Sequence, residues 1–197
     1  MNRQQQKQDT REKLLAAAAA CFAEKGYAGC SVADIARKAG VAQGAMYVHF
    51  KNKEALFIAM ITGEHGQGAE KARQALEASP YLEGVVGIME SCIRDVGFPV
   101  DHRLWTEILA VTAREPAIRE AFAVSDKAMR TVFAELLRKA ADAGEIARDL
   151  DFDAVAVWLY ALVDGLIART ADDTDFDFQK HAAVFETLVR RALRPQQ

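Results

Sequence analysis

The chain has 197 residues, of which 51% are apolar and 27% are charged, and its formal net charge is −3. This composition is that of an ordinary soluble protein, long enough for one large domain or for a small domain joined to a larger one. The polar start argues against a signal peptide, and the longest early apolar run, Leu14 to Ala23, is too short to cross a membrane. We therefore expect a cytoplasmic protein with no membrane contact.

Basic residues are concentrated at the start of the chain. Residues 1–53 carry nine Lys and Arg against four Asp and Glu, which is +5, whereas the remaining residues carry 16 against 24, which is −8. This asymmetry predicts that the N-terminal quarter binds a polyanion. The alternative is that the basic side chains only solvate one face of the protein.

The three cysteines are Cys21, Cys30 and Cys92. Their number is odd and no two are spaced as a CxxC pair, which disfavours both a disulfide framework and a zinc site. We expect free thiols in a reducing compartment.

The apolar spacing is helical from end to end, and strand signals are almost absent. A capping box at residues 9–12 predicts the start of the first helix, which Gly26 ends. Ser31 to Asp34 repeats the capping pattern and opens a helix of two turns, which Gly40 ends in a left-handed cap.

Two further helices follow a tight turn. The third is short and runs from about Ala42 to Phe50, and Asn52 then caps a fourth that begins at Lys53. The glycine-containing stretch at residues 62–68 weakens the middle of this fourth helix.

Prolines mark the later helices. Pro80 opens a helix that continues to about Val96, Pro99 precedes another, and Pro116 occupies the first position of a long one that ends at Gly144. The last two helices are predicted at about residues 152–170 and 177–193. The fold class is therefore all-α, with about nine helices.

The second-last helix is apolar on every side from Ala154 to Val163. Such a helix must be covered on every side, and a subunit interface is the simplest cover, with Gly165 allowing close approach. This predicts a homodimer formed through residues 152–170 and 177–193. The alternative is a central helix in the core of a monomer.

The third helix contains a glycine that costs about 1 kcal/mol relative to alanine. On a helical wheel Met46 and Phe50 share one face, which we expect to be buried, and the opposite face holds Gly44, Ala45 and Val48. A face of small residues allows a helix to enter the DNA major groove. Two short helices joined by a glycine-containing turn in a basic segment thus predict a helix-turn-helix.

The stretch TREKLLAAAAACFAEKGYAGCSVADIARKAGVAQGAMYVHFKNKEALF resembles the N-terminal domain of the TetR family of bacterial transcriptional regulators. The resemblance covers about residues 10–60 and implies a helix-turn-helix DNA-binding domain at 1–53. It further implies a helical domain at 54–197 that binds a ligand and dimerises through its last two helices. LWTEILAVTAREPAIREAF and DFDAVAVWLYALVDGLIAR are similar to the subgroup that includes the choline-responsive repressor of betaine synthesis.

The resemblance also implies the residues that contact DNA. Phosphates would be contacted by Ser31, Tyr47, His49 and Lys53, and base edges by Gln43, Gly44, Ala45 and Val48. Glutamine can pair with adenine, small apolar groups can meet thymine methyls, and helix N-termini favour anions.

One position departs from the family pattern. The residue before Gln43 is often serine or threonine in the family, whereas Ala42 has no hydroxyl to cap the helix or to bond a phosphate. Two assignments have structural alternatives: Tyr47 as an aromatic residue of the domain core, and His49 as a helix-end cap.

A mainly hydrophobic ligand pocket is expected among large or soft residues of the middle helices, each of which has plain core as its alternative. These residues are Met89, Cys92, Ile93, Phe98, His102, Trp105, Phe122, Met129, Phe133 and Trp158. The sequence contains no catalytic constellation, metal-binding motif or phosphate loop, so we expect no cofactor, no metal and no enzyme activity.

These features predict a ligand-responsive transcriptional repressor that binds a pseudo-palindromic operator as a dimer and is released by a small hydrophobic or amphipathic effector. One alternative is a DNA-binding protein of the same fold that needs no inducer and acts in chromosome organisation or division. Another is a small-molecule enzyme built in the helical bundle.

Overall fold

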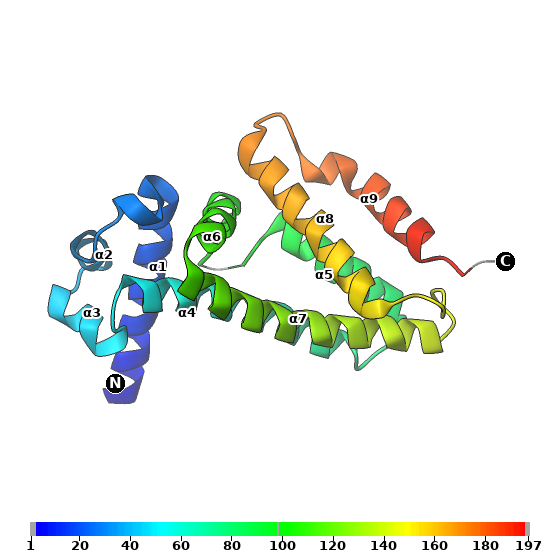
Figure 1. Cartoon of the computed structure of the whole chain (residues 1–197), viewed down its shortest axis with the longest axis horizontal. Helices are drawn as coiled ribbons and strands as arrows, with labels where there is room; N and C mark the ends of the chain where they lie inside the picture. The colour runs from blue at the N-terminus through cyan, green and yellow to red at the C-terminus, as the bar shows by residue number, and fades with distance from the viewer. Residues whose placement is uncertain (1–2, 98, 196–197) are drawn as a thin grey trace. The chain divides into compact units, whose positions relative to one another are not determined.

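The computed structural model describes residues 3–97 and 99–195 (Figure 1). Within this part of the chain there are nine helices and, apart from an isolated bridge between Gly97 and Val100, no extended pairing. The predicted all-α class is confirmed. The helices are α1 Arg3–Gly29, α2 Val32–Ala39, α3 Gln43–His49, α4 Lys53–Ala75, α5 Tyr81–Arg94, α6 His102–Arg114, α7 Pro116–Asp142, α8 Phe152–Asp172 and α9 Phe178–Leu193.

The chain forms two compact units. Unit 1 comprises Met1–Glu64 and Gly97–Phe122, and unit 2 comprises His65–Val96 and Ala123–Gln197. Unit 1 also includes residues 54–64 and 97–122, which follow the predicted domain boundary at 53/54. The second of these ranges contains α6, which packs against α1. The boundary from the sequence remains a prediction about function, whereas the two units describe packing.

Helix α1 begins at Arg3, before the capping box that was expected to start it. That expectation is wrong, because Thr10 lies inside the helix and its hydroxyl donates to the carbonyl of Gln6 at 2.8 Å. Side-chain pairs one turn apart support the added turns: Gln5 donates to Asp9 at 3.1 Å and Gln8 donates to Glu12 at 2.7 Å. Hydrophobic periodicity could not reveal this segment because it has no buried face.

Gly26, predicted to end the first helix, instead interrupts α1, which continues to Gly29. Its φ of 70° and ψ of 164° are not helical, and a positive φ strongly favours glycine. The chain after the break is held by Glu107 of α6, whose carboxylate accepts the Tyr27 backbone N–H at 2.6 Å. A Cβ at Gly26 would lie 3.3 Å from the same carboxylate oxygen, so both conformation and space favour glycine here.

Helices α1, α2 and α3 and the start of α4 lie together in unit 1 (Figure 1), and their buried side chains form its core. Its centre contains Leu14, Phe22, Ile35, Met46 and Phe57, none of which is more than 1% exposed. The rings of Phe22 and Phe57 meet edge to face, with centroids 5.2 Å apart. Burying each of these side chains contributes about 1.5–3 kcal/mol, so the small α2 and α3 helices are stabilised mainly by this core.

In unit 2, α5 packs against α8 and α9. The predicted start and stop signals are confirmed: Pro116 is the first residue of α7, and Gly144 has a left-handed φ of 77° just after that helix ends. The carboxylate of Glu145 accepts the backbone N–H of Leu82 at 2.6 Å, which ties the start of α5 to the turn after α7.

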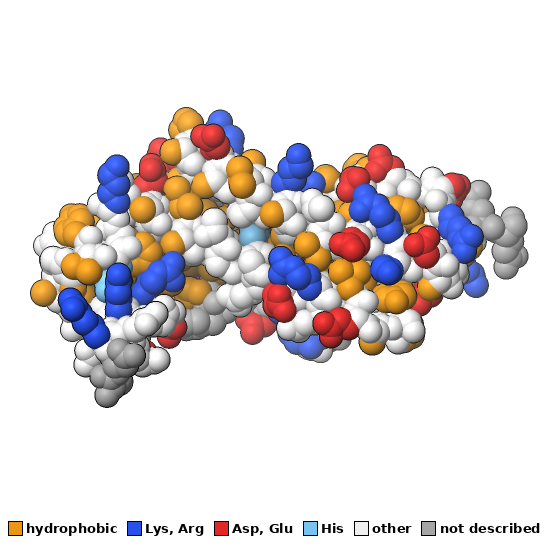
Figure 2. Space-filling view, turned by 90° about the horizontal axis from the view of Figure 1, so that it is seen from below, with side chains coloured by type: hydrophobic (Ala, Val, Ile, Leu, Met, Phe, Trp, Pro, Cys, Tyr) orange, Lys and Arg blue, Asp and Glu red, His pale blue; other side chains and the backbone are white. Residues whose placement is uncertain are grey.

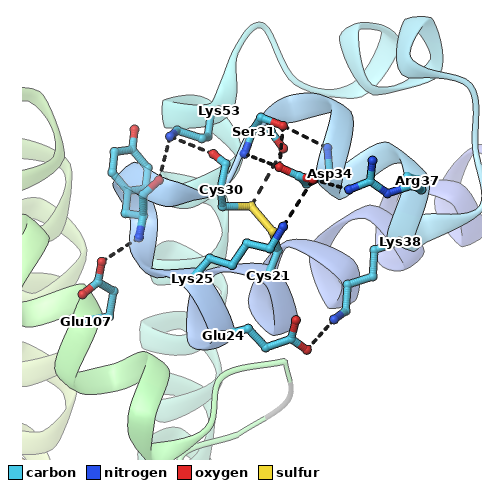
Figure 3. Close-up of a disulfide and its surroundings, with 11 residues drawn as sticks. Cys21, Glu24, Lys25, Cys30, Ser31, Asp34, Arg37, Lys38, Lys53 and Glu107 are labelled. Carbon is cyan, nitrogen blue, oxygen red and sulfur yellow. Dashed lines mark hydrogen bonds and ion pairs between the residues drawn. A yellow bond between two sulfur atoms is a disulfide. The ribbon is translucent and has the colours of Figure 1, made fainter.

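The cysteine prediction is wrong for two of the three residues. Cys21 and Cys30 form a disulfide, with a Cα–Cα distance of 6.0 Å (Figure 3). Cys92 is not part of a disulfide. The break at Gly26 turns the chain back, so a cysteine on α1 meets the residue just before the cap of α2. No sequence motif signals this pairing, because it depends on the turn and not on the spacing.

Candidate nucleic-acid interface

The start of α2 is fixed by a capping box. The backbone N–H of Asp34 donates to the Ser31 hydroxyl at 3.1 Å, and the Asp34 carboxylate accepts the Ser31 backbone N–H at 3.1 Å. The hydrogen bonds from Ser31, followed by the nearby Lys25 ammonium, hold the pKa of Asp34 well below its usual range. The Asp34 carboxylate also pairs with Arg37 (Figure 3). Ser31 is exposed to solvent. Its capping hydrogen bonds with Asp34 fix the backbone at the N-terminus of α2.

The face of α3 predicted to be buried is buried, and the opposite face is open. Met46 is fully buried and Phe50, just after the helix, is 5% exposed, whereas Val48 is 69% exposed. Gly44 is exposed as well, and a Cβ added to it would meet no atom within 4 Å. The open face therefore offers a surface of small residues, which is what close approach to a groove needs.

The start of α3 is as weakly held as the sequence predicted. Ala42 occupies the cap position in an extended conformation and makes no side-chain hydrogen bond to the helix. Gln43 and Gly44 follow as exposed residues of the first turn, and Ala45 is half-buried.

Tyr47 and His49 lie at the margins of α3. Tyr47 is 54% exposed, so the alternative that it belongs to the domain core does not hold here. His49, the last helical residue, is half-buried near Lys7 and Arg11 of α1. Burial, and after it the charges of Lys7 and Arg11, lowers the pKa of His49.

Lys53, expected at a phosphate, is turned toward the protein. Its ammonium donates to the carbonyl of Tyr27 at 2.6 Å and to that of Cys30 at 3.0 Å, and it lies 4.3 Å from the Tyr27 ring centroid (Figure 3). Burial lowers its pKa. In this arrangement Lys53 links the start of α4 to the turn before α2.

Three of the residues expected in a ligand pocket line one small cavity in unit 2. Met89 and Cys92 of α5 and Phe133 of α7 line one cavity, together with four residues that the sequence did not single out: Ile88, Leu159, Tyr160 and Val163. Its volume is about 10 Å³, which is roughly the space that one water requires. Leu159 and Val163 are one turn apart on α8, but an all-apolar helix gives no pattern that would have selected them.

The other expected pocket residues lie elsewhere. Trp158 is 77% exposed, because α8 turns Leu159 and Val163 inward and leaves Trp158 on its outer face. Ile93 and Met129 are buried in unit 2 outside the cavity lining. Three expected residues belong to unit 1, namely His102, Trp105 and Phe122, the last two with ring centroids 6.2 Å apart. Phe98 lies outside the described residues.

One histidine lies in the interior of unit 2. His65 of α4 is 2% exposed, and its Nδ1 lies 2.7 Å from the Ser125 hydroxyl. Burial lowers its pKa to about 4. No group of residues in the described part of the chain could hold a metal ion.

Two family models match this chain. The model of the bacterial regulatory proteins of the tetR family matches residues 14–60, and that of the BetI-type transcriptional repressor C-terminal domain matches residues 82–194. The chain belongs to the TetR family. Both parts of the resemblance seen in the sequence are thereby confirmed, and the helix-turn-helix formed by α2 and α3 is the TetR-family DNA-binding motif.

The chain is similar to other members along nearly all of its length. HTH-type transcriptional repressor Rv1474c of Mycobacterium tuberculosis is 29% identical over 93% of this chain and 92% of that protein. A TetR-family transcriptional regulator from Rhodococcus sp. has the same fold, with a TM-score of 0.80 at 24% identity over 94% of this chain and 99% of that one. FadR from Bacillus subtilis, solved with stearoyl-CoA, has a TM-score of 0.74 at 22% identity over 92% and 98% of the two chains.

The family and these relatives are transcriptional regulators and not enzymes. TetR-family regulators bind DNA operators and small-molecule effectors and act as dimers. This chain is accordingly a helix-turn-helix transcriptional regulator of the repressor type, which sets aside the enzyme alternative.

Proposed function

We propose that this TetR-family regulator represses transcription from a pseudo-palindromic operator, with the two α3 helices of a homodimer in successive major grooves about 34–36 Å apart. The observation that carries the proposal is the open face of α3 at Gly44, Ala45 and Val48, backed by the buried Met46 and Phe50. A protruding side chain at Gly44 would keep the helix out of the groove.

Base edges and phosphates are contacted by different residues in this proposal. Gln43 pairs with adenine, and Ala45 and Val48 meet thymine methyls. Tyr47 and His49 contact phosphates from the margins of the helix.

The hydrogen bonds of Ser31 and Lys53 lead us to propose different roles for these two residues, both of which were predicted to contact phosphates. Ser31 brings a phosphate to the N-terminus of α2, where backbone N–H groups and the helix dipole favour an anion. Lys53, whose ammonium already donates to two carbonyls, supports the turn before α2 and adds positive charge behind it.

We propose that the dimer forms through α8 and α9. Five large apolar side chains on these helices are 42–77% exposed: Val157, Trp158, Leu162, Val184 and Leu188. Gly165 of α8 leaves open space where a second helix could approach. Homodimer interfaces are more apolar than the rest of a protein surface and are enriched in aromatic residues.

The exposed apolar surface of α8 is also relevant to the cellular location of the protein. By length and composition, α8 is the one helix in the described residues that could cross a membrane, and 22% of its apolar window is buried. A dimer interface accounts for that exposed apolar surface without a membrane, so we propose a cytoplasmic protein.

The effector is proposed to be a small hydrophobic or amphipathic molecule that enters unit 2 at the cavity between α5, α7 and α8. The lining is apolar, which supports a ligand with an apolar part, and stearoyl-CoA bound to FadR of the same fold is amphipathic. Since the cavity holds about one water, effector binding must select a more open arrangement. A switch from 1:99 to 99:1 would need about 5.5 kcal/mol of preference for that arrangement.

A genome-wide binding map of the protein, followed by affinity measurements on the duplexes recovered, tests the proposal. One or a few promoter sites with two-fold symmetry are expected, with an affinity that falls steeply with salt because phosphates are neutralised. Many dispersed sites would instead favour the role in chromosome organisation, and an affinity that ignores salt would contradict the interface.

A further inference from the structure

The first three turns of α1 form the wall of two adjoining hollows in unit 1. The larger, of about 830 Å³, is lined from α1 by Arg3, Gln4, Gln6, Lys7 and Thr10 and from α3 by Val48 and His49. The smaller, of about 560 Å³, shares Gln4, Lys7 and His49 with it and adds Gln5, Gln8 and Arg11. Both hollows are open and are lined by basic and amide side chains, whereas the cavity of unit 2 is lined mainly by apolar ones.

The chemistry of this surface suits an anionic chain. Every ionisable side chain that lines either hollow is basic, and the other α1 side chains there are amides and one hydroxyl. The two acids of the segment, Asp9 and Glu12, line neither hollow and accept hydrogen bonds from neighbouring glutamines. Figure 2 shows Lys and Arg side chains gathered over the part of unit 1 that holds α1 and α3.

This surface continues the proposed reading face of α3. Val48 belongs to that face and also lines the larger hollow, and His49 lines both. The charges of Lys7 and Arg11 contribute to the lowered pKa of His49, after burial, which places three basic groups within electrostatic reach of one another. A phosphate placed among them would relieve this repulsion.

The segment at residues 3–13, called the extension below, precedes the part of the chain that the tetR family model matches, which begins at residue 14. Its helical structure from Arg3 extends α1 by about three turns before that point. The extension therefore places residues on the proposed DNA side of unit 1 that lie outside the matched range 14–60.

We propose that Arg3 and Lys7 of this extension bind the sugar-phosphate backbone of the same duplex that α3 reads, with the strand lying in the larger hollow. The inference rests on the proposed DNA binding and deepens it. It assigns the extension the role of adding affinity without adding sequence preference, since phosphate contacts carry no base information.

Salt titrations of Arg3→Gln, Lys7→Gln and the double variant test this role. Glutamine removes the charge and keeps a similar helix propensity, so circular dichroism should show unchanged helicity. Lys13→Gln is the matched control, because Lys13 is an exposed basic residue of the same helix and lines neither hollow. The probes are the duplex that the wild type selects from a random library and an unselected duplex of equal length.

Each single variant is expected to reduce the magnitude of the slope of log K against log salt by about 0.9, and the double variant by about 1.8, on both probes. The Lys13→Gln slope should match the wild type. Unchanged slopes in the double variant, or an equal loss in the control, would overturn the proposal. If the wild type binds neither probe, the proposed DNA binding itself fails, which is a separate outcome.

Discussion

Gly44→Leu is expected to strengthen the fold and weaken DNA binding. The new Cβ meets no atom within 4 Å and the residue is helical, so the leucine fits the free protein without a clash. Replacing a helical glycine by a good helix former gains up to about 1 kcal/mol. The free energy of unfolding should therefore rise or stay level.

In the complex with the operator, the introduced leucine side chain would occupy the space between α3 and the floor of the major groove. Forcing an extra side chain into a packed contact costs about 1–3 kcal/mol, which corresponds to a 5- to 150-fold loss of affinity. Stability and binding thus change in opposite directions, which a general loss of structure cannot produce.

The assay combines urea unfolding with fluorescence anisotropy on the selected duplex. Gly63→Leu is the matched control, since Gly63 is an exposed glycine of α4 that also has open space at its Cβ and lies outside the reading face. The control should keep wild-type affinity. Wild-type affinity in Gly44→Leu would refute close approach at this glycine, and so would a loss of affinity that merely follows a loss of helicity.

Three other properties can be measured directly. Because burial lowers the pKa of His65 to about 4, the unfolded chain takes up a proton below pH 6.5 that the folded chain refuses; stability should therefore fall by about 2 kcal/mol from pH 8 to pH 5 in urea unfolding, and His65→Gln should lose most of this dependence. A thiol reductant should lower the free energy of unfolding by roughly 2–3 kcal/mol, since the Cys21–Cys30 loop is short; an unchanged urea midpoint after complete reduction, monitored by thiol titration, would contradict this. Light scattering should find Trp158→Lys monomeric and Val124→Lys, a control at a 69% exposed apolar residue of α7, dimeric; a dimeric Trp158→Lys would remove α8 from the interface.

Local signals in the sequence predicted most helix boundaries. The capping box at Ser31, the left-handed Gly40 and Pro116 at the start of α7 each act within one turn, so they can be recognised without knowing the fold. The buried Met46 and Phe50 were predictable for a similar reason, because the wheel position of a short amphipathic helix selects one face.

Features that depend on tertiary structure were missed. The Cys21–Cys30 disulfide requires the chain reversal at Gly26, which spacing alone does not describe. The direction of Trp158 was unpredictable because α8 is apolar all round and its sequence does not distinguish inner from outer faces. The inward Lys53 likewise depends on two carbonyls brought to it by the turn before α2.

The two ends of the recognition helix are held differently. At its start α3 has no side-chain cap and an early glycine, and a helix of seven residues has little stability of its own. At its end Phe50 is buried, and the Arg11 guanidinium lies 5.3 Å from the Phe50 ring centroid, so α1 supports this end before DNA arrives. The larger of the two hollows between α1 and α3 lies at this supported end, where His49 lines it. Phosphate contacts by Arg3 and Lys7 would thus fix the duplex against the ordered end of α3, while Gln43 and Gly44 at the uncapped end adjust to the bases.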